Sequence, residues 1–259
     1  MKDKILVNQY LDRINYHGEI QATLAVLSQL QQAHLMNIPF ENLNVYYGIN
    51  VDLGKLFDKI ILNQRGGFCY ELNWPFHELL LALGFDAKVA SARVYDHKNG
   101  YGEEFDHMVI IVRIDGADYL VDVGFGEFSS YPIKIELDKE FADPRGTFKI
   151  ETYDQIYKIV KRKNDAGEFL PVYIFSEKKR ELNEFSGMCT YHQTSSDSPF
   201  TQKRLCTMLV GDGRVTLTGQ TLKTTVNGVV TDRELASEEE VKQVLLDVFK
   251  IRISSEYTQ

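Results

Sequence analysis

Helical spacing of apolar residues dominates the first third of the chain. Leucine, isoleucine and tyrosine recur so that each segment has one apolar face. The helices predicted from this pattern cover residues 4–14, 21–36, 53–62 and 69–83. Asp52 is suited to cap the third of them, and Gly84 ends the fourth. We therefore predict a helical domain over residues 1–84.

Short runs rich in valine, isoleucine and tyrosine replace this pattern in the middle of the chain. The strands predicted there cover residues 87–95, 107–114, 119–123, 149–160 and 170–175. Asn99-Gly100 and Asp115-Gly116 separate the first runs and are typical of tight turns between antiparallel strands. We predict a central antiparallel β-barrel that forms a second domain over residues 85–193.

The last part of the chain mixes both patterns. A helical stretch over residues 181–192 precedes three short strands, which cover residues 205–210, 214–218 and 221–226. Ser237 and Glu240 have the spacing of a capping box, which predicts a final helix that ends near Phe249. We predict a third domain, an α/β lid over residues 194–259, that begins in the loop 194–201. The predicted fold class is therefore α+β.

Composition narrows the classes of function. The chain has 259 residues, of which 44% are hydrophobic and 25% charged, and its net charge is −8. This acidic balance argues against nucleic acid as a partner, because binding to phosphates requires clustered Lys and Arg. It does not exclude an anionic cofactor, for which a local group of donors is sufficient.

Two further patterns concern the compartment. Residues 1–14 alternate charged and apolar residues and lack the apolar centre of a secretion signal, and no apolar run is long enough to span a membrane. The cysteines, Cys69, Cys189 and Cys206, lack the spacing of a metal site and are expected to be reduced thiols. We therefore expect a cytoplasmic protein with no metal and no membrane partner, either a monomer or a homodimer.

Cys69 has the sequence surroundings of a reactive thiol. Gly66 and Gly67 relax the backbone just before it, and Cys69 falls in the first turn of the predicted helix. Backbone N–H donors and the helix dipole favour a thiolate at this position. The alternative is that Cys69 is a small buried apolar residue, as most free cysteines are.

His107 and Asp122 are candidates to assist this thiol. His107 stands at the start of a predicted strand, directly after a polar loop, where its ring can point into a cleft. Asp122 interrupts an apolar strand, and a buried carboxylate needs a partner because its desolvation is costly. An imidazolium would be such a partner; the alternative is that Asp122 faces solvent. The remaining histidines are interpreted as surface or structural residues: His17, His34, His77, His97 and His192.

The order Cys, His, Asp along the chain predicts a catalytic triad. The carboxylate would fix the tautomer and orientation of the ring, and the ring would hold the thiolate as an ion pair. Papain-like proteases have the same order with Asn in place of Asp. The predicted catalytic core is therefore cysteine-protease-like, and the order alone leaves both hydrolysis and transfer open. Gly124 and Gly126, which follow Asp122, favour close approach by a ligand.

With these residues in place, the sequence resembles the arylamine N-acetyltransferases in their bacterial form. The motifs that carry the resemblance extend from the first helices to the last third of the chain. They are Ile38-Pro-Phe-Glu-Asn-Leu43, Arg65-Gly-Gly-Phe-Cys69-Tyr-Glu-Leu-Asn73, Asp106-His-Met-Val109, Val121-Asp-Val-Gly-Phe-Gly126 and Ser198-Pro-Phe-Thr201. The helical domain, β-barrel and α/β lid of that family agree with the order predicted above.

The resemblance implies roles for single residues. Cys69, His107 and Asp122 would form the triad, and an ion pair between Glu41 and Arg65 would support it. Apolar residues at four positions match those that line the substrate pocket in similar proteins: Phe40, Val94, Phe125 and Phe200. The alternative for these four is plain core packing.

The resemblance also implies a two-step, ping-pong acetyl transfer. Cys69 would take the acetyl group from acetyl-CoA, the acyl donor, and pass it to an arylamine, an arylhydrazine or an arylhydroxylamine, with O-acetylation as a related reaction. His107 would collect the proton that the amine sheds. Gly124 and Gly126 would let the pantetheine arm approach closely. The segment 102–106 is acidic, where family members often have small hydroxyl residues near the cofactor.

Three other readings fit the same pattern of residues. The first is an amide synthase that uses a larger acyl donor, and the second is a cysteine hydrolase with the same triad. The third is a non-enzymatic protein that binds aromatic ligands. Donor scope and the need for a CoA thioester would separate them.

Overall fold

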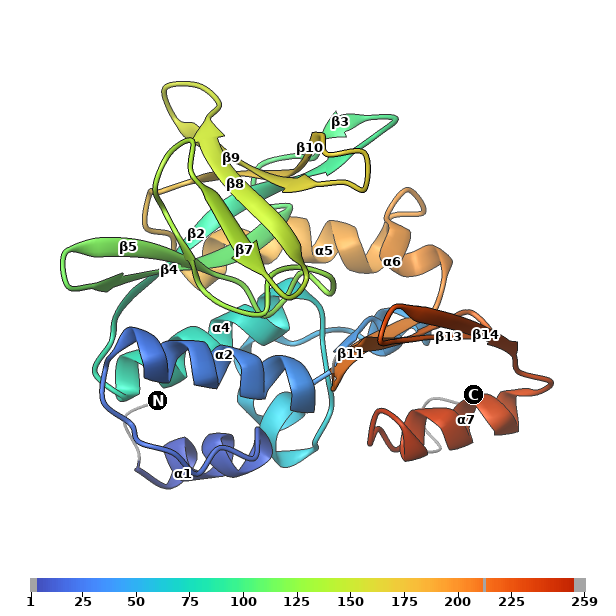
Figure 1. Ribbon diagram of the computed structural model, residues 1–259. Coiled ribbons are helices and arrows are strands. Elements are labelled where there is room, and N and C mark those ends of the chain that lie inside the picture. The colour runs from blue at the N-terminus through green and yellow to red at the C-terminus, as the bar shows by residue number, and fades with distance from the viewer. Residues whose placement is uncertain (1–3, 212, 254–259) are drawn as a thin grey trace.

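The computed structural model describes residues 4–211 and 213–253. Figure 1 shows a curled sheet above a group of N-terminal helices, with a second sheet and the last helix beside them. The α+β class predicted from the sequence is confirmed, as are the helical region, the nearly closed barrel and the lid.

The helices of the N-terminal region are α1 (Lys4–Arg13), α2 (Leu24–Asn37), α3 (Leu43–Tyr46) and α4 (Cys69–Ala82). Three of them, α1, α2 and α4, match predicted segments to within three residues at each end, whereas the short α3 was not predicted. Asp52 acts as a cap, since its Oδ1 accepts a hydrogen bond of 2.8 Å from the Gly54 amide. The segment after Asp52 is not one regular helix as predicted, because it divides into a 3₁₀ turn, η1 (Leu53–Lys55), and a π-helix, η2 (Asp58–Leu62).

The barrel is a single antiparallel sheet in the order β6-β5-β4-β2-β10-β9-β8-β7, with β3 paired to β2. Its strands are β2 (Asp86–Asp96), β3 (Gly100–Tyr101), β4 (His107–Ile114), β5 (Ala117–Val121), β6 (Ile133–Lys134), β7 (Glu140–Asp143), β8 (Gly146–Thr152), β9 (Tyr157–Lys163) and β10 (Phe169–Ser176). The predicted strand 149–160 is wrong as one element. Asp154 ends β8 there, because its Oδ1 accepts the amides of Ile156 and Tyr157 and closes a turn.

The second sheet, called the lid sheet below, has the order β1-β11-β12-β13-β14. Its strands are β1 (Phe40–Glu41), β11 (Leu205–Val210), β12 (Gly213–Thr218), β13 (Thr221–Val226) and β14 (Val229–Glu234). β14 was not predicted, because all of its residues are exposed and no apolar alternation marks it. β1 belongs to the N-terminal third but pairs with β11, so a sheet crosses one of the predicted domain boundaries, and those boundaries stay a prediction.

The remaining helices lie between and beside the two sheets. They are η3 (Leu182–Phe185), α5 (Ser186–Thr194), α6 (Pro199–Gln202) and α7 (Glu238–Asp247). Ser237 caps α7 as predicted, since its Oγ accepts a hydrogen bond of 3.2 Å from the Glu240 amide.

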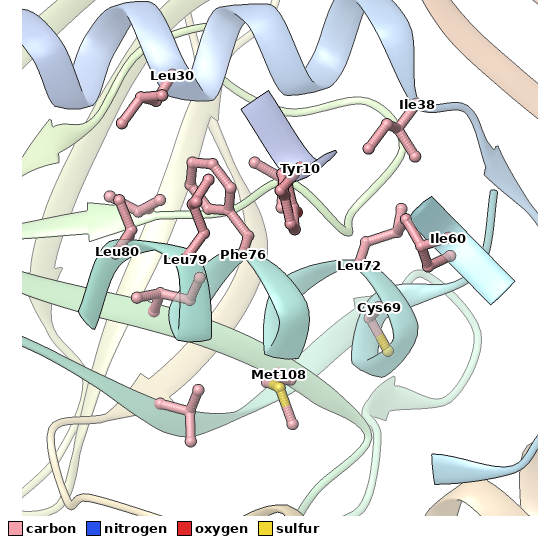
Figure 2. Packing of buried hydrophobic residues seen from close by; sticks show 14 of the residues in the cluster. Tyr10, Leu30, Ile38, Ile60, Cys69, Leu72, Phe76, Leu79, Leu80 and Met108 are labelled. Carbon is pink, nitrogen blue, oxygen red and sulfur yellow. The ribbon is translucent and has the colours of Figure 1, made fainter. Parts of the chain in front are cut away.

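Helix α4 is the centre of the main core. Leu72 and Phe76 of α4 pack together with Tyr10 from α1, and Met108 of β4 lies on the other side of the helix (Figure 2). Pro75 stands inside α4 without ending it. Because both sides of α4 are buried, its first residue, Cys69, is held against the barrel.

Candidate active site

His107 and Asp122 form a buried pair between two neighbouring strands. His107 is the first residue of β4, and Asp122 follows the last residue of β5, which pairs with β4. Nε2 of His107 lies 2.7 Å from Oδ2 of Asp122, and both side chains are almost fully buried. Nδ1 of the ring makes no hydrogen bond to the described residues, so it is available as a proton acceptor.

Asn73 holds the carboxylate of Asp122 from helix α4. Its Nδ2 donates to Oδ1 of Asp122 at 3.0 Å, and its Oδ1 accepts from the Val123 amide at 2.9 Å. The Gly124 amide donates to the same carboxylate oxygen at 2.9 Å. The sequence motif contained Asn73 without a role for it. The signal was an amide side chain one helical turn after Cys69, on the same face of the helix as the thiol.

Tyr173 covers the other side of the pair. It lies in β10, is fully buried, and its ring centroid is 5.5 Å from that of His107. Burial raises the pKa of its hydroxyl well above the usual value, and the nearby charge of Asp122 adds to this. Its position in the site depends on the pairing of β10 with β2, and nothing in the sequence distinguished it from a core tyrosine.

Cys69 is the first residue of α4 and lies against the start of β4. Figure 2 shows its sulfur on the side of the helix that faces Met108. Burial raises the pKa of the thiol well above its usual value, and the charge of Asp106 adds to this, whereas the Met108 amide lowers it. A thiolate at Cys69 therefore requires a positive partner in addition to the helix N-terminus.

The loop after Asp122 packs directly on the first turn of α4. A Cβ atom at Gly124 would lie 2.8 Å from both Cα and the carbonyl oxygen of Cys69, and 2.7 Å from Nδ2 of Asn73. This contact brings the loop that follows Asp122 against Cys69, whereas a direct contact between Cys69 and His107 stays a prediction. Gly124 is therefore needed for packing within the protein, and a contact of Gly124 or Gly126 with a cofactor stays a prediction.

Buried ion pairs support the N-terminus of α4. Nη2 of Arg65 lies 2.7 Å from Oε1 of Glu41, and Nζ of Lys59 lies 2.7 Å from Oε1 of Glu71. Oε2 of Glu71 also accepts the Phe68 amide at 3.2 Å, which satisfies a free donor at the start of the helix. The ion pair implied for Glu41 and Arg65 is thus present, and it belongs to a larger network.

The four predicted pocket residues fall into separate places. The ring of Phe200 lies 5.4 Å from Phe68 and 6.1 Å from Phe40, and all three surround the start of α4. The ring of Phe125 lies 5.4 Å from His107 on the barrel side. Val94 is in β2, where its amide donates to Oδ2 of Asp106 at 3.0 Å. The structure therefore brings aromatic rings to two sides of the cluster, and their contact with a substrate stays a prediction.

His192 belongs to the same region, although the sequence interpretation treated it as a surface or structural residue. It is buried in α5, and its Nε2 lies 3.2 Å from the carbonyl oxygen and 3.4 Å from Oδ1 of Asp106. Its ring lies 5.0 Å from that of Phe200. His192 thus faces the carboxylate whose charge acts most strongly on Cys69.

Two kinds of feature are absent from the part of the chain that the structure describes. No group of three or more His, Cys, Asp or Glu side chains in residues 4–211 and 213–253 is placed to hold a metal ion. In the same ranges, no helix has both the length and the apolar character needed to cross a bilayer.

The sequence of the chain is similar to those of known acetyltransferases. A family model described as N-acetyltransferase matches residues 23–258. The pineal gland isozyme NAT-10 of Gallus gallus, an arylamine N-acetyltransferase, is 31% identical, with 95% of this chain and 94% of that protein covered. Arylamine N-acetyltransferase 1 of Homo sapiens is 30% identical with the same coverage.

Solved structures show the same fold. The Mycobacterium marinum arylamine N-acetyltransferase superposes with a TM-score of 0.87 at 28% identity and covers 95% of this chain and 92% of its own. The same enzyme in complex with CoA gives a TM-score of 0.87 at 29% identity, with the same coverage.

Proposed function

The chain belongs to the arylamine N-acetyltransferase family and is an acyltransferase, and from this premise we propose that it acetylates arylamines through an acetyl-Cys69 intermediate. Its acyl donor is acetyl-CoA, as in the family at large. Arylhydrazines and arylhydroxylamines are further acceptors in the proposal, with O-acetylation of the last. The observation that carries the proposal is the buried pair of His107 and Asp122, with 2.7 Å between Nε2 and Oδ2, next to the loop that packs on Cys69.

The first half-reaction charges the enzyme. Nδ1 of His107 takes the proton of Cys69, and the resulting imidazolium is stabilised by the Asp122 carboxylate at Nε2. The thiolate attacks the thioester carbonyl of acetyl-CoA, and the tetrahedral intermediate collapses with loss of CoA. The CoA sulfur takes its proton from His107. One thioester replaces another, so the step depends on positioning more than on driving force.

The second half-reaction transfers the acetyl group to the amine. An aromatic amine is weakly basic, so it is neutral and nucleophilic at pH 7. Its nitrogen attacks the acetyl-Cys69 carbonyl, His107 accepts the proton that the nitrogen loses, and Cys69 leaves as the thiolate. The rings of Phe40, Phe125 and Phe200 supply flat apolar surface for such an acceptor.

The compartment also belongs to the proposal. All three cysteines are buried and unpaired, which supports a cytoplasmic enzyme with reduced thiols.

Substitution of the three cysteines tests the mechanism. Incubation with acetyl-CoA alone should place one acetyl group on Cys69, visible by mass spectrometry of peptides. Cys69→Ala should remove both this label and arylamine-dependent release of CoA, because the mechanism assigns the thioester to Cys69 alone. Cys189→Ala and Cys206→Ala are matched controls, since both thiols are buried, and they should keep the label and the release. Transfer by Cys69→Ala, or a label on another cysteine, would refute the mechanism.

A further inference from the structure

Three arginines meet where the barrel joins the lid sheet. Arg145 stands in the turn between β7 and β8, Arg162 in β9, and Arg214 in β12. Nη2 of Arg162 donates to the carbonyl oxygen of Arg145 at 2.6 Å. Nη2 of Arg145 donates to the carbonyl oxygen of Gly213 at 2.7 Å, directly before Arg214. Two separate sheets thus contribute guanidinium groups to one place, here named the arginine cluster.

The positive charge of the arginine cluster is only partly compensated. Arg162 pairs with Glu127 at 3.3 Å, but the Glu127 side chain is 62% exposed, so this pair is weak. Within the described part of the chain, no carboxylate lies within 4.0 Å of the guanidinium groups of Arg145 or Arg214. Asp143 is near Arg145, but its oxygens accept backbone amides, among them that of Arg145.

The guanidinium group of Arg214 lacks a full set of hydrogen-bond partners among the described residues. Its Nη1 donates to Oγ1 of Thr207 at 2.8 Å, whereas its buried Nε has no partner among the described residues. Burial, with the like charge of Arg145, lowers the pKa of Arg214 to about 10. The side chain is still protonated at neutral pH. A half-buried cation of this kind is stabilised by an anion that reaches it.

The arginine cluster adjoins the candidate active site. Arg214 lines a small cavity together with Phe40, Val123 and Gly126, and the last two belong to the segment that directly follows Asp122. Glu127, the partner of Arg162, follows directly on Gly126. A ligand that extends from Cys69 toward the lid sheet would therefore meet the arginines with its far end.

Guanidinium groups bind phosphate oxygens in preference to most other ligands, because the planar donors match their geometry. Acetyl-CoA carries its phosphates at the end remote from the thioester. We propose that Arg145, Arg162 and Arg214 bind a phosphate group of the CoA donor. This inference rests on the proposed function, and it assigns to this chain a donor-binding site at the junction of barrel and lid.

Two acetyl donors, one with and one without the phosphate-bearing nucleotide, test the assignment. Acetyl-CoA and S-acetyl-pantetheine share the thioester and the arm, but the second lacks the nucleotide. In Arg145→Gln and Arg162→Gln, KM for acetyl-CoA should rise about 10-fold or more, because each substitution removes one hydrogen bond to a charged phosphate group. KM for S-acetyl-pantetheine should change less than about 2-fold, and kcat at saturation should be retained. Glu127→Gln should shift KM for acetyl-CoA downward, because it removes the opposing charge.

Arg113→Gln is the matched control. Arg113 is an exposed arginine paired with Asp118 at 3.5 Å, on the β4–β5 hairpin that lies away from the lid sheet (Figure 1). It should leave KM for both donors unchanged. Arg214→Lys keeps the positive charge at the most buried position of the arginine cluster. Its KM for acetyl-CoA should therefore rise less than that of Arg214→Gln. If Arg214→Gln fails to fold, the two other positions decide the test.

Three results would overturn the assignment. One is an equal rise in KM for both donors, and another is no rise for either. The third is a rise in KM for 4-aminobenzoate but not for 4-aminobenzamide, which would mean that the arginines bind the carboxylate of an acceptor. Calorimetric binding of CoA and pantetheine needs no turnover. Weaker binding of CoA, but not of pantetheine, in the variants would show a phosphate site even if no arylamine is acetylated. Intact acetyl transfer together with unchanged CoA affinity in the variants would reject the phosphate site and leave the proposed function standing.

Discussion

Cys69 combines features that oppose a thiolate with features that favour one. Burial and the charge of Asp106 raise the pKa of the thiol, whereas the Met108 amide lowers it. The position at the start of α4 adds the helix dipole, which was the basis of the sequence prediction. In the proposed mechanism, the reactivity of Cys69 therefore depends on His107 as its proton acceptor.

Replacement of His107 tests this dependence. In His107→Gln, Cys69 should behave as an isolated buried thiol, so its alkylation by iodoacetamide at neutral pH should fall roughly 100-fold or more. Because burial raises the pKa of the thiol, alkylation should rise only above the pH at which a free thiol ionises. His97→Gln, an exposed histidine, should keep the wild-type profile. Rapid alkylation of His107→Gln at neutral pH would contradict the ion pair.

A change at Asp106 should act in the opposite direction. Asp106→Asn removes the negative charge that raises the pKa of Cys69 but keeps an oxygen for the Val94 amide. The alkylation profile should therefore move to lower pH. Glu103→Gln, an exposed carboxylate in the same loop, is the matched control. An unchanged or higher midpoint in Asp106→Asn would show that this charge does not act on Cys69.

At the scale of elements, the site depends on how closely α4 approaches the loop after β5. Asn73 ties the helix to Asp122 and Val123, and Gly124 lets the two backbones touch. The triad prediction used only residue types and chain order. It could not include Asn73, Tyr173 or His192, because their places depend on which helix face and which strands meet.

Gly124→Ala should show how much this contact matters. The added Cβ would lie 2.8 Å from backbone atoms of Cys69, which cannot rotate away, so α4 and the loop must separate. We expect a loss of about 1–3 kcal/mol of unfolding free energy and a fall in kcat/KM. Both would be measured in the same preparation by urea unfolding and by acceptor-dependent CoA release.

Gly187→Ala is the matched control for this substitution. Gly187 is an exposed residue in α5, and a Cβ there would have no neighbour within 4 Å. Alanine should stabilise the helix by roughly 0.5–1 kcal/mol and leave the rate unchanged. Wild-type stability and rate in Gly124→Ala would refute the close approach.

At the scale of the whole molecule, Glu41 links the parts of the fold. It lies in β1, which pairs with β11 of the lid sheet, and its carboxylate reaches Arg65 in the loop before α4. Burial alone would raise the pKa of Glu41, but Arg65, Lys59 and the Leu43 amide outweigh this and hold it below the usual value.

The lowered pKa predicts a loss of stability in acid. The folded state binds this proton less tightly than the unfolded chain, so the pair contributes stability above the unfolded pKa of about 4.5. That contribution is lost as pH falls through the folded pKa. Glu41→Gln should therefore cost about 3–5 kcal/mol at pH 7, and progressively less below about pH 4.5. Urea unfolding at several pH values measures the difference, with exposed Glu239→Gln as control. A difference that stays constant with pH would reject this linkage.

Apolar spacing and local motifs were enough to predict the α+β class, the positions of most helices and strands, and the three residues of the candidate triad. These follow from local information, since apolar spacing reports helices and strands, and motifs report chemistry. The sequence did not indicate β1 or β14, because a two-residue strand and a fully exposed one carry no apolar period.

Only the tertiary structure decided which groups meet. Asn73 reaches Asp122 across 49 positions of the chain, and His192 reaches Asp106 across 86. The arginine cluster joins two sheets in the same way. The tertiary structure also buries Cys69, and this burial raises the pKa of the thiol against the effect of the helix N-terminus. Desolvation and charge depend on every neighbour in space, and most of these neighbours are distant along the chain.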